Sequence, residues 1–261
     1  MKKILRVIAV DYKKLSKEDW DSVLIIAGDE GTGKSQLGLH IVDEWMKLSG
    51  RECTEQDIKY ICLNIEQFVG QLKQLEKVTP IVYDEAGELS NLRRTSQFNV
   101  AINLAYQIIR GKNILTILIL PSLFDLDAFF TKRRARGFIQ VWTRGKYAFY
   151  NKRKLREIME VYQRKKNQYI ALKKVKPLFK GTFKIYTGVM AKAYKEKKET
   201  RMNEVIKILE EKLGKLNKGE DKNDMENNTE EHINMGIPDN LIDLSSGRYG
   251  GNNGNTNIYN A

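Results

Sequence analysis

The sequence is poor in the residues that build metal centres and disulfide frameworks. It holds two cysteines and two histidines in 261 residues. Cys53 and Cys62 have neither a C-x-x-C spacing nor histidine partners, and His40 and His232 suggest no ligand set, so no zinc site or disulfide scaffold is indicated. The chain also lacks a run of about eighteen apolar residues and the apolar core of a signal peptide. We therefore expect no membrane span and a cytoplasmic location.

Acidic residues are outnumbered by basic ones. The chain has 45 Lys and Arg against 33 Asp and Glu, a formal net charge of +12 and a pI near 9.5. The tail beyond about residue 217 is acidic, so the rest of the chain is more basic than the total suggests. Charge of this sign predicts a polyanionic partner.

One glycine-rich stretch organises the chain. Residues 28–35 read GDEGTGKS, fit the P-loop pattern G-x-x-x-x-G-K-[ST] and follow the apolar run at residues 23–27. In such a loop, backbone N–H groups converge on phosphate oxygens, and the helix expected over residues 36–48 adds its dipole. Lys34 would reach the β- and γ-phosphates, and Ser35 would place its hydroxyl on Mg²⁺.

The expected nucleotide contacts are the whole loop and the residue after it. They are Gly28, Asp29, Glu30, Gly31, Thr32, Gly33, Lys34, Ser35 and Gln36. An acidic pair inside a phosphate-binding loop is tolerated if the side chains of Asp29 and Glu30 point outward while the backbone binds. We expect that arrangement.

A second motif lies downstream of the loop. Residues 79–87 read TPIVYDEAG, an apolar strand that ends in Asp84 and Glu85. After a P-loop this is the Walker B pattern, in which Asp84 lies beside Mg²⁺ and Glu85 orients and activates the attacking water. Read alone, the same residues could form an ordinary acidic turn. The two motifs together predict ATP and Mg²⁺ as cofactors and Lys34 and Glu85 as catalytic residues.

Helical and strand patterns alternate along the chain. We expect strands at 4–10, 23–27, 60–64, 79–84 and 114–120, and helices at 36–48, 66–75 and 98–109. Residues 4–10 are expected to form an edge strand, and 16–20 to close one edge of the sheet. The continuous apolar run at 114–120 indicates a strand buried on both faces. The pattern predicts an α/β fold with a doubly wound, mostly parallel sheet, of the P-loop NTPase, ASCE-like type.

The residues around the second motif and the last of these strands resemble a known family. They are YDEAG at 83–87, RGKN at 110–113, the strand at 114–120 and PSLFDLD at 121–127. They look like ATPases of archaeal and bacterial mobile elements, similar to the zonular occludens toxin group and the HerA and FtsK superfamily of DNA-pumping motors. The resemblance covers about residues 23–150. It implies the roles given above for Lys34, Ser35, Asp84 and Glu85.

The resemblance also implies residues that read the γ-phosphate. Motors of this superfamily commonly end the strand after Walker B with a polar sensor, often Gln; here Ser122 is the candidate. A homo-oligomeric ATPase would also need an arginine that reaches a neighbouring active site. The candidates for this arginine finger are Arg110, Arg133, Arg134 and Arg136. Asp125 and Asp127 either cap a helix or add a second metal site.

From residue 131 the charge becomes one-sided. The apolar runs at 138–142 and 147–150, joined by TRGK at 143–146, predict a β-hairpin with basic ends. The candidate DNA contacts are Lys132, Arg144, Lys146, Lys152, Arg153 and Lys154. Such a surface tracks DNA phosphates without base specificity. The alternative is a solvated, Lys-rich surface without a ligand.

The C-terminal part is expected to be helical and then disordered. We expect a basic helix at 155–168, a turn at 177–183 and a long helix at 191–213. The Asn- and Gly-rich tail is expected to be disordered, with one apolar island at 238–244 that could dock a protein partner. The expected division is a lead segment at 1–20, an ATPase core at 21–150, a basic helical extension at 151–216 and a tail at 217–261.

These features support three functional hypotheses. The first is a Mg²⁺-dependent ATPase that translocates or packages DNA for a virus, plasmid or integrated element, and acts in the host cytoplasm if the element is viral. The second is an assembly or extrusion ATPase of the zonular occludens toxin type that acts on protein partners; the lack of a membrane segment argues against it. The third is a nucleotide-binding switch or small-molecule kinase, and a glutamate directly after the Mg²⁺ carboxylate argues against a kinase.

Overall fold

The computed structural model describes residues 1–84, 109, 111–126 and 128–217. The predictions made for Glu85, Arg110 and Asp127, for the loop and helix before residue 109 and for the tail from 218 lie outside the described residues. The chain divides into two units, Met1–Ile206 and Lys207–Ala261. All of the contacts discussed below lie in the first unit.

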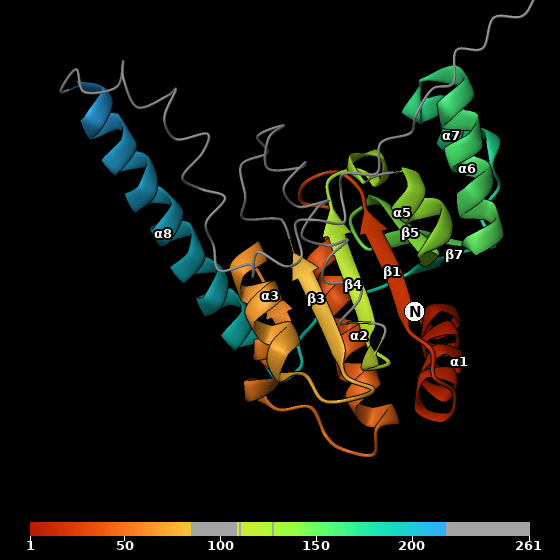
Figure 1. The fold of residues 1–261 in the computed structure, drawn as a ribbon, viewed down its shortest axis with the longest axis horizontal. Coiled ribbons are helices and arrows are strands. Elements are labelled where there is room, and N and C mark those ends of the chain that lie inside the picture. The colour runs from red at the N-terminus through yellow and green to blue at the C-terminus, as the bar shows by residue number, and fades with distance from the viewer. Residues whose placement is uncertain (85–108, 110, 127, 218–261) are drawn as a thin grey trace, which may run out of the picture. The chain divides into compact units, whose positions relative to one another are not determined.

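Helices and strands alternate through the first two thirds of the described chain (Figure 1). In chain order the elements are α1 (Lys2–Lys17), β1 (Ser22–Ala27), α2 (Lys34–Leu48), the 3-10 helix η1 (Glu55–Tyr60), β2 (Ile61–Cys62), α3 (Ile65–Gln74), β3 (Pro80–Asp84), β4 (Leu115–Leu120), the 3-10 helix η3 (Leu123–Asp125), α5 (Ala128–Arg133), β5 (Ala135–Thr143), β6 (Lys146–Asn151), α6 (Lys152–Lys165), α7 (Gln168–Lys174), β7 (Phe179–Thr182) and α8 (Met190–Asn217). The expected P-loop strand, the helix after it and the helix at 66–75 are confirmed.

The strands of the described residues form one seven-stranded sheet in the order β2-β3-β4-β1-β5-β6-β7. The first five in this order are parallel, and β6 and β7 are antiparallel additions. β4 pairs with both β1 and β3, so it lies between the P-loop strand and the strand that ends in Asp84. The predicted α/β class with a mostly parallel sheet is confirmed.

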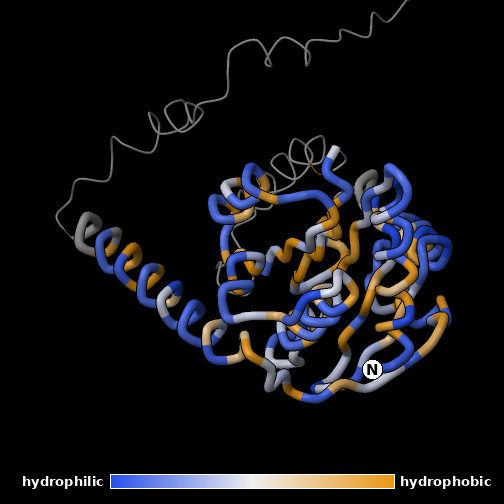
Figure 2. Tube along the Cα trace, turned by 90° about the horizontal axis from the view of Figure 1, so that it is seen from below, coloured by the Kyte–Doolittle hydropathy of each residue, from blue (hydrophilic) through white to orange (hydrophobic). Residues whose placement is uncertain are grey.

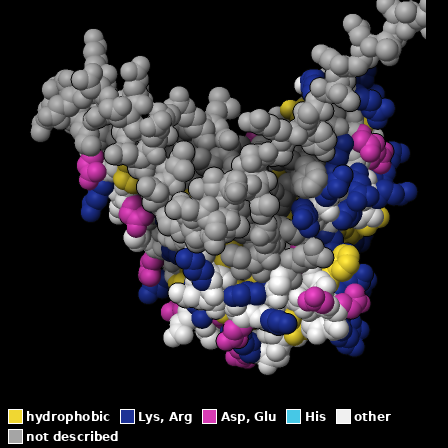
Figure 3. All heavy atoms as spheres, viewed as in Figure 1, with side chains coloured by type: hydrophobic (Ala, Val, Ile, Leu, Met, Phe, Trp, Pro, Cys, Tyr) yellow, Lys and Arg dark blue, Asp and Glu magenta, His cyan; other side chains and the backbone are white. Residues whose placement is uncertain are grey.

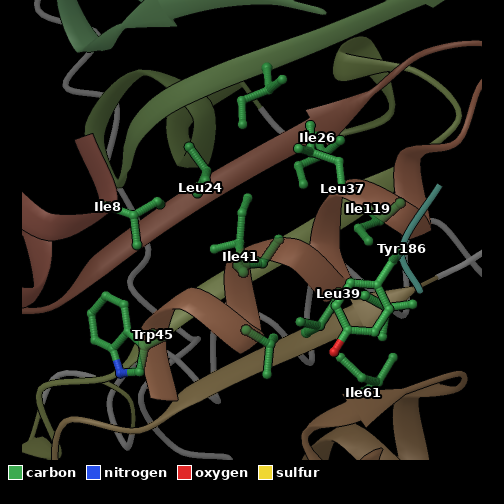
Figure 4. Packing of buried hydrophobic residues seen from close by; sticks show 14 of the residues in the cluster. Ile8, Leu24, Ile26, Leu37, Leu39, Ile41, Trp45, Ile61, Ile119 and Tyr186 are labelled. Atoms are coloured by element: carbon green, nitrogen blue, oxygen red, sulfur yellow. The ribbon is translucent and has the colours of Figure 1, made fainter. Parts of the chain in front are cut away.

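Helices cover both faces of this sheet. In β1 the side chains of Val23 and Ile25 enter the core under α3, α6 and α7, whereas Leu24 and Ile26 enter the core under α1 and α2. Figure 4 shows the second core, in which Trp45 of α2 and Ile8 of α1 approach the strands. Hydrophobic residues are concentrated on the strands, and the outer sides of the helices are hydrophilic (Figure 2). Because successive strand residues face opposite sides, a run that is apolar at every position is buried on both.

The N-terminal prediction is wrong. Residues 4–10 form part of helix α1 and not an edge strand, and the edges of the sheet are β2 and β7. Ile4, Ile8, Asp11 and Leu15 are the buried residues of α1, at intervals of four, three and four. This helical period outweighs the strand preference of the β-branched residues around it.

The predicted hairpin is confirmed, with β5 and β6 joined by a turn in which Gly145 has a φ of 75°. The single helix predicted at 155–168 is wrong in extent: α6 ends where Lys166 adopts a φ of 51°, and Asn167 caps a second helix, α7. The turn predicted at 177–183 is also wrong, because residues 179–182 form β7, which pairs with β6. The sheet therefore continues beyond residue 150.

The long helix predicted at 191–213 is confirmed as α8. Within the part of the chain that the structure describes, none of the helices combines the length and the apolar character needed to cross a bilayer.

Candidate nucleotide-binding site

The carboxyl ends of β1 and β3 meet at one edge of the sheet. β4 holds them in register, with Leu120 beside Ala27 and Ile119 beside Asp84. The P-loop begins at Gly28, whose N–H donates to the carbonyl of Pro121 just after β4, at 3.3 Å. The topology therefore brings the two predicted motifs together at the edge where open α/β sheets bind ligands.

Glycine is required at both residue 28 and residue 33 of the loop. A Cβ on Gly28 would overlap the backbone carbonyl oxygen of Val141 in β5. Gly33 caps α2 with a φ of 95°, in the left-handed region that favours glycine. The hydroxyl of Thr32 donates to the carbonyl of Asp29 at 2.7 Å and fixes the turn between them. The N–H groups of the first turn of α2, which have no partner within the helix, therefore follow directly on this turn.

Lys34 is folded back over the loop. Its Nζ donates to the carbonyl oxygens of Gly28 (2.6 Å) and Asp29 (2.9 Å). Burial lowers the pKa of Lys34, and the negative charge of Asp84 and of Glu30 acts in the opposite direction. The side chains of Asp29 and Glu30 are exposed, as the sequence suggested. The ammonium group of Lys34 is thus held at the loop by two backbone carbonyls.

The carboxylate of Asp84 is fully buried and is bonded to a residue that the sequence did not predict. The hydroxyl of Tyr194, in α8, donates to Oδ2 of Asp84 at 2.8 Å. The side chain of Ser35 makes a further hydrogen-bonding contact with the same hydroxyl. Burial raises the pKa of Tyr194, and the adjacent charge of Asp84 raises it further. One neutral phenol therefore joins the two predicted Mg²⁺ ligands.

The sequence held a weak signal for this role. In the sequence, Tyr194 is one of the few apolar residues in a segment dense in Lys and Glu. In the structure its side chain is only 5% exposed. A buried aromatic on such a helix indicates docking, but its partner Asp84 lies 110 residues earlier in the chain. Local spacing cannot identify that partner.

The segment between β7 and α8 is bonded to α2. Gln36, predicted as a nucleotide contact, accepts the backbone N–H of Tyr186 through its side-chain oxygen at 2.9 Å. Nε2 of His40 lies 3.0 Å from the carbonyl oxygen of Lys184, and its ring meets that of Tyr186 edge-on. Tyr186 is 3% exposed and lies in the core shown in Figure 4. The helix that begins at the P-loop is therefore covered by the C-terminal part of the first unit.

The residues present fit Mg²⁺ and a nucleotide phosphate. Ser35 and Asp84 supply a hydroxyl and a carboxylate oxygen, the hard donors that Mg²⁺ prefers. Both already bond one oxygen atom, that of Tyr194, so they lie around a common point. Lys34 and the loop backbone provide the positive groups that a phosphate needs.

The structure gives Ser122 and Asp125 a capping role. The N–H of Ser122 donates to the carboxylate of Asp125 at 3.0 Å, and its hydroxyl accepts the N–H of Phe124 at 3.2 Å and donates to Gln168 at 3.3 Å. The capping alternative is thereby confirmed for Asp125. Among the described residues, no group of three or more His, Cys, Asp or Glu side chains is placed to hold a metal. Ser122 lies just after β4, at the same edge of the sheet as the P-loop. Its role as a γ-phosphate sensor stays a prediction.

The candidate arginines differ in position. Arg136 forms an ion pair through its Nε with Oδ1 of Asp11, a carboxylate that is 3% exposed and also accepts from the hydroxyl of Ser22. Ser22 begins β1, so Arg136 lies at the amino edge of the sheet, opposite the P-loop. Arg133 and Arg134 are exposed beside it, just before β5. This position supports a structural role for Arg136.

The candidate DNA contacts form two groups. Arg144 and Lys146 are exposed at the turn of the hairpin, at the P-loop edge. Lys152, Arg153 and Lys154 follow β6 at the opposite edge, and Lys132 lies close to them because Arg156 donates to its carbonyl at 3.0 Å. Six residues of β5, about 20 Å, separate the two ends of the hairpin. The sequence predicted a hairpin with basic ends, and the antiparallel pairing places these ends at opposite edges of the sheet.

Comparisons with known proteins give no family for this chain. No protein-family model matches it, and no curated protein matches it significantly.

Proposed function

We propose that this protein is a Mg²⁺-dependent ATPase that uses ATP hydrolysis to move or package DNA. The observation that carries the proposal is the convergence of Lys34, Ser35 and Asp84 at one edge of the sheet, where Ser35 and Asp84 share a hydrogen-bonding partner. A P-loop lysine, a hydroxyl and a buried carboxylate in this arrangement support a site for Mg²⁺ and a nucleoside triphosphate.

Each residue has a defined part in this proposal. The loop backbone and Lys34 bind the phosphates. To do so, Nζ of Lys34 gives up its hydrogen bonds to the carbonyl oxygens of Gly28 and Asp29 and bonds phosphate oxygens in their place. Ser35 and Asp84 hold Mg²⁺, which neutralises phosphate charge when it is bound. Glu85, the next residue in the chain, is the proposed base that orients water. The position of β4 between β1 and β3 supports the ASCE-like class within the α/β fold.

The charge at the start of α6 supports a DNA partner. Its first turn consists of Lys152, Arg153 and Lys154 and contains no acid. Each positive charge at a helix N-terminus opposes the helix dipole by about 0.3–1 kcal/mol, so this turn is not arranged for helix stability. Burial lowers the pKa of Lys152, and the positive charges of Arg156 and Arg136 lower it further. Figure 3 shows Lys and Arg side chains gathered where α6 and α7 lie. Phosphates would offset this concentration of charge.

The test is steady-state ATP hydrolysis with Mg²⁺, with and without linear duplex DNA, at two salt concentrations. The wild type is compared with Glu85→Gln and with Glu76→Gln, a control at an exposed glutamate just before β3. We expect DNA to raise the rate several-fold, high salt to remove this increase and Glu85→Gln alone to abolish turnover. Hydrolysis that is indifferent to DNA at both salt concentrations would instead favour an ATPase that acts on protein partners.

A nucleotide-binding switch is the second candidate. The contact between Tyr194 and Asp84 favours it, because a C-terminal helix bonded to the metal ligands can respond to nucleotide without turnover. Nucleotide binding at the wild-type site without hydrolysis, with or without DNA, would select this function.

A further inference from the structure

We propose that Tyr194 gates the nucleotide site. Its hydroxyl holds Ser35 and Asp84, leaves them when Mg²⁺ and nucleotide bind, and thereby loosens the first turns of α8. The inference rests on the proposed function, since it requires Ser35 and Asp84 to be the Mg²⁺ ligands.

The first step of the argument is competition for the same atoms. The Tyr194 hydroxyl donates to Asp84 Oδ2 at 2.8 Å and also contacts the side chain of Ser35. A hydroxyl that contacts both side chains lies close to where an ion bound by both would lie. A bound ion and the tyrosine hydroxyl therefore compete for this position.

The second step is the packing of the ring. Tyr194 is 5% exposed and belongs to the core that contains Met190, Tyr186 and residues of α2. Close-packed cores leave little free volume for a large ring to change position. The ring of Tyr194 can therefore leave Asp84 only if its surroundings move.

The third step concerns the start of α8, which carries the ring. Met190, Tyr194 and Lys197 lie at intervals of four and three residues, on one face of the helix. Met190 is fully buried, and Lys197 donates to the carbonyl oxygens of Ile61 (2.6 Å) and Ile58 (3.2 Å). Burial lowers the pKa of Lys197. Tyr194 is the middle one of three contacts, so its release weakens the docking of the whole face.

The preceding segment limits where the movement begins. The N–H of Tyr186 and the carbonyl of Lys184 are bonded to Gln36 and His40 of α2, and the N–H of Phe183 donates to Gly145 at 2.8 Å. These bonds do not involve the metal ligands. We expect residues 183–186 to stay on α2 while residues 190–200 loosen.

The first test is nucleotide affinity. Tyr194→Phe keeps the ring and removes the hydroxyl. Tyr186→Phe is the matched control, because Tyr186 is a buried tyrosine in the segment just before α8, and its neighbours are Asp43, Cys53 and Met190. A fluorescent ATP analogue is titrated into each protein with Mg²⁺ and with EDTA. We expect Tyr194→Phe to bind about threefold to tenfold more tightly than wild type with Mg²⁺, the value of one hydrogen bond, and equally with EDTA. Tyr186→Phe should match wild type in both. Equal Mg²⁺-dependent affinities for Tyr194→Phe and wild type would overturn the gate.

The second test is independent of affinity. Amide hydrogen exchange of full-length wild type is measured alone, with Mg²⁺, with a non-hydrolysable ATP analogue in EDTA, and with Mg²⁺ plus the analogue. Faster exchange at residues 190–200 only in the last condition, with residues 183–186 unchanged, is the expected result. Unchanged exchange at 190–200, at analogue concentrations where binding is demonstrated, contradicts the gate and leaves the proposed function intact. If no binding with Mg²⁺ is detected, the proposed function fails and the gate fails with it.

Discussion

The backbone N–H of Gly145 donates to the carbonyl oxygen of Thr32 at 3.4 Å, so the turn of the basic hairpin is bonded to the P-loop. The carbonyl of Gly145 accepts the N–H of Phe183, whose ring lies against Gly33. Arg144 and Lys146 flank this glycine and are exposed. A polyanion that binds Arg144 and Lys146 would pull on the hairpin turn. Through the hydrogen bond between Gly145 and Thr32, this pull would reach the loop backbone that is proposed to bind phosphate.

The two basic groups are predicted to contribute differently to DNA-dependent activity. Arg144→Glu/Lys146→Glu should weaken duplex DNA binding and reduce the stimulation of ATP hydrolysis even at saturating DNA, because the hairpin turn touches the P-loop. Arg153→Glu/Lys154→Glu should weaken binding by a similar amount but leave the stimulation at saturation, because these residues lie at the opposite edge. Fluorescence anisotropy with labelled duplex at several salt concentrations gives the affinity, and each double variant should reduce the salt slope by about two.

The matched control for both is Lys73→Glu/Lys77→Glu, which changes the net charge equally at exposed lysines at the end of α3 and just beyond it. A loss of DNA affinity in this control as large as in the other two would show that net charge alone decides binding. The division into two functional groups would then be wrong.

Gly28→Ala is predicted to be severely destabilising. The added methyl group would overlap the backbone carbonyl of Val141, and neither the loop nor β5 can move without loss of sheet pairing. We expect a loss on the order of 2–3 kcal/mol in the free energy of unfolding, together with loss of nucleotide binding. Urea unfolding measures the first effect. Gly70→Ala in α3 is the control, because a methyl group there meets open space and favours the helix; similar stabilities for the two variants would contradict this reading of the loop.

Arg136 is predicted to be structural. Arg136→Ala leaves the buried carboxylate of Asp11 without its main counter-charge and should cost about 3 kcal/mol of unfolding free energy, whereas Asp11→Asn/Arg136→Ala should recover most of it. Asp11 has a raised pKa mainly because of burial, and Arg136 lowers it, so the pKa rises further in Arg136→Ala. A raised carboxyl pKa stabilises the fold below the unfolded pKa, and this stabilisation is lost as the pH rises through the folded pKa.

The difference in stability between Arg136→Ala and the double variant should therefore be small near pH 4 and grow toward pH 7. Thermal unfolding across this range measures it. A difference that does not change with pH, or no loss of stability in Arg136→Ala, would return Arg136 to the candidates for a residue that acts on a neighbouring subunit.

The sequence was sufficient to predict the glycine-rich loop at residues 28–35, the helix after it and the strand that carries Asp84. Each depends on local information, because a fixed glycine pattern and apolar runs specify a turn and its flanking elements within a few residues. The same local reasoning failed at α1, where the β-branched Ile4, Val7 and Ile8 were read as a strand although Ile4, Ile8 and Leu15 recur at helical intervals. The strand propensity of the β-branched residues and the helical spacing of the apolar residues disagreed there. Burial of the apolar face against α2 favoured the helix.

Contacts between residues that are far apart in the chain could not be predicted from the sequence. Nothing near Asp84 in the chain indicates that Tyr194 is its partner, and nothing near Arg136 indicates Asp11. The basic residues from 132 to 154 are close in sequence, but an antiparallel hairpin places Arg144 and Lys152 at opposite edges of the sheet. Each of these relationships follows from the topology and not from spacing.

The most direct test of a Mg²⁺-nucleotide site at Ser35 and Asp84 is the affinity for ATP, measured by titration calorimetry with Mg²⁺ and with EDTA. Wild type and Asp84→Asn are compared, with thermal unfolding as a check that the variant is folded. We expect Mg²⁺ to tighten ATP binding to wild type by about tenfold or more, and this gain to disappear in Asp84→Asn while the affinity in EDTA is unchanged. Equal affinity with and without Mg²⁺ in wild type, or the full Mg²⁺ effect in folded Asp84→Asn, would contradict the proposed site.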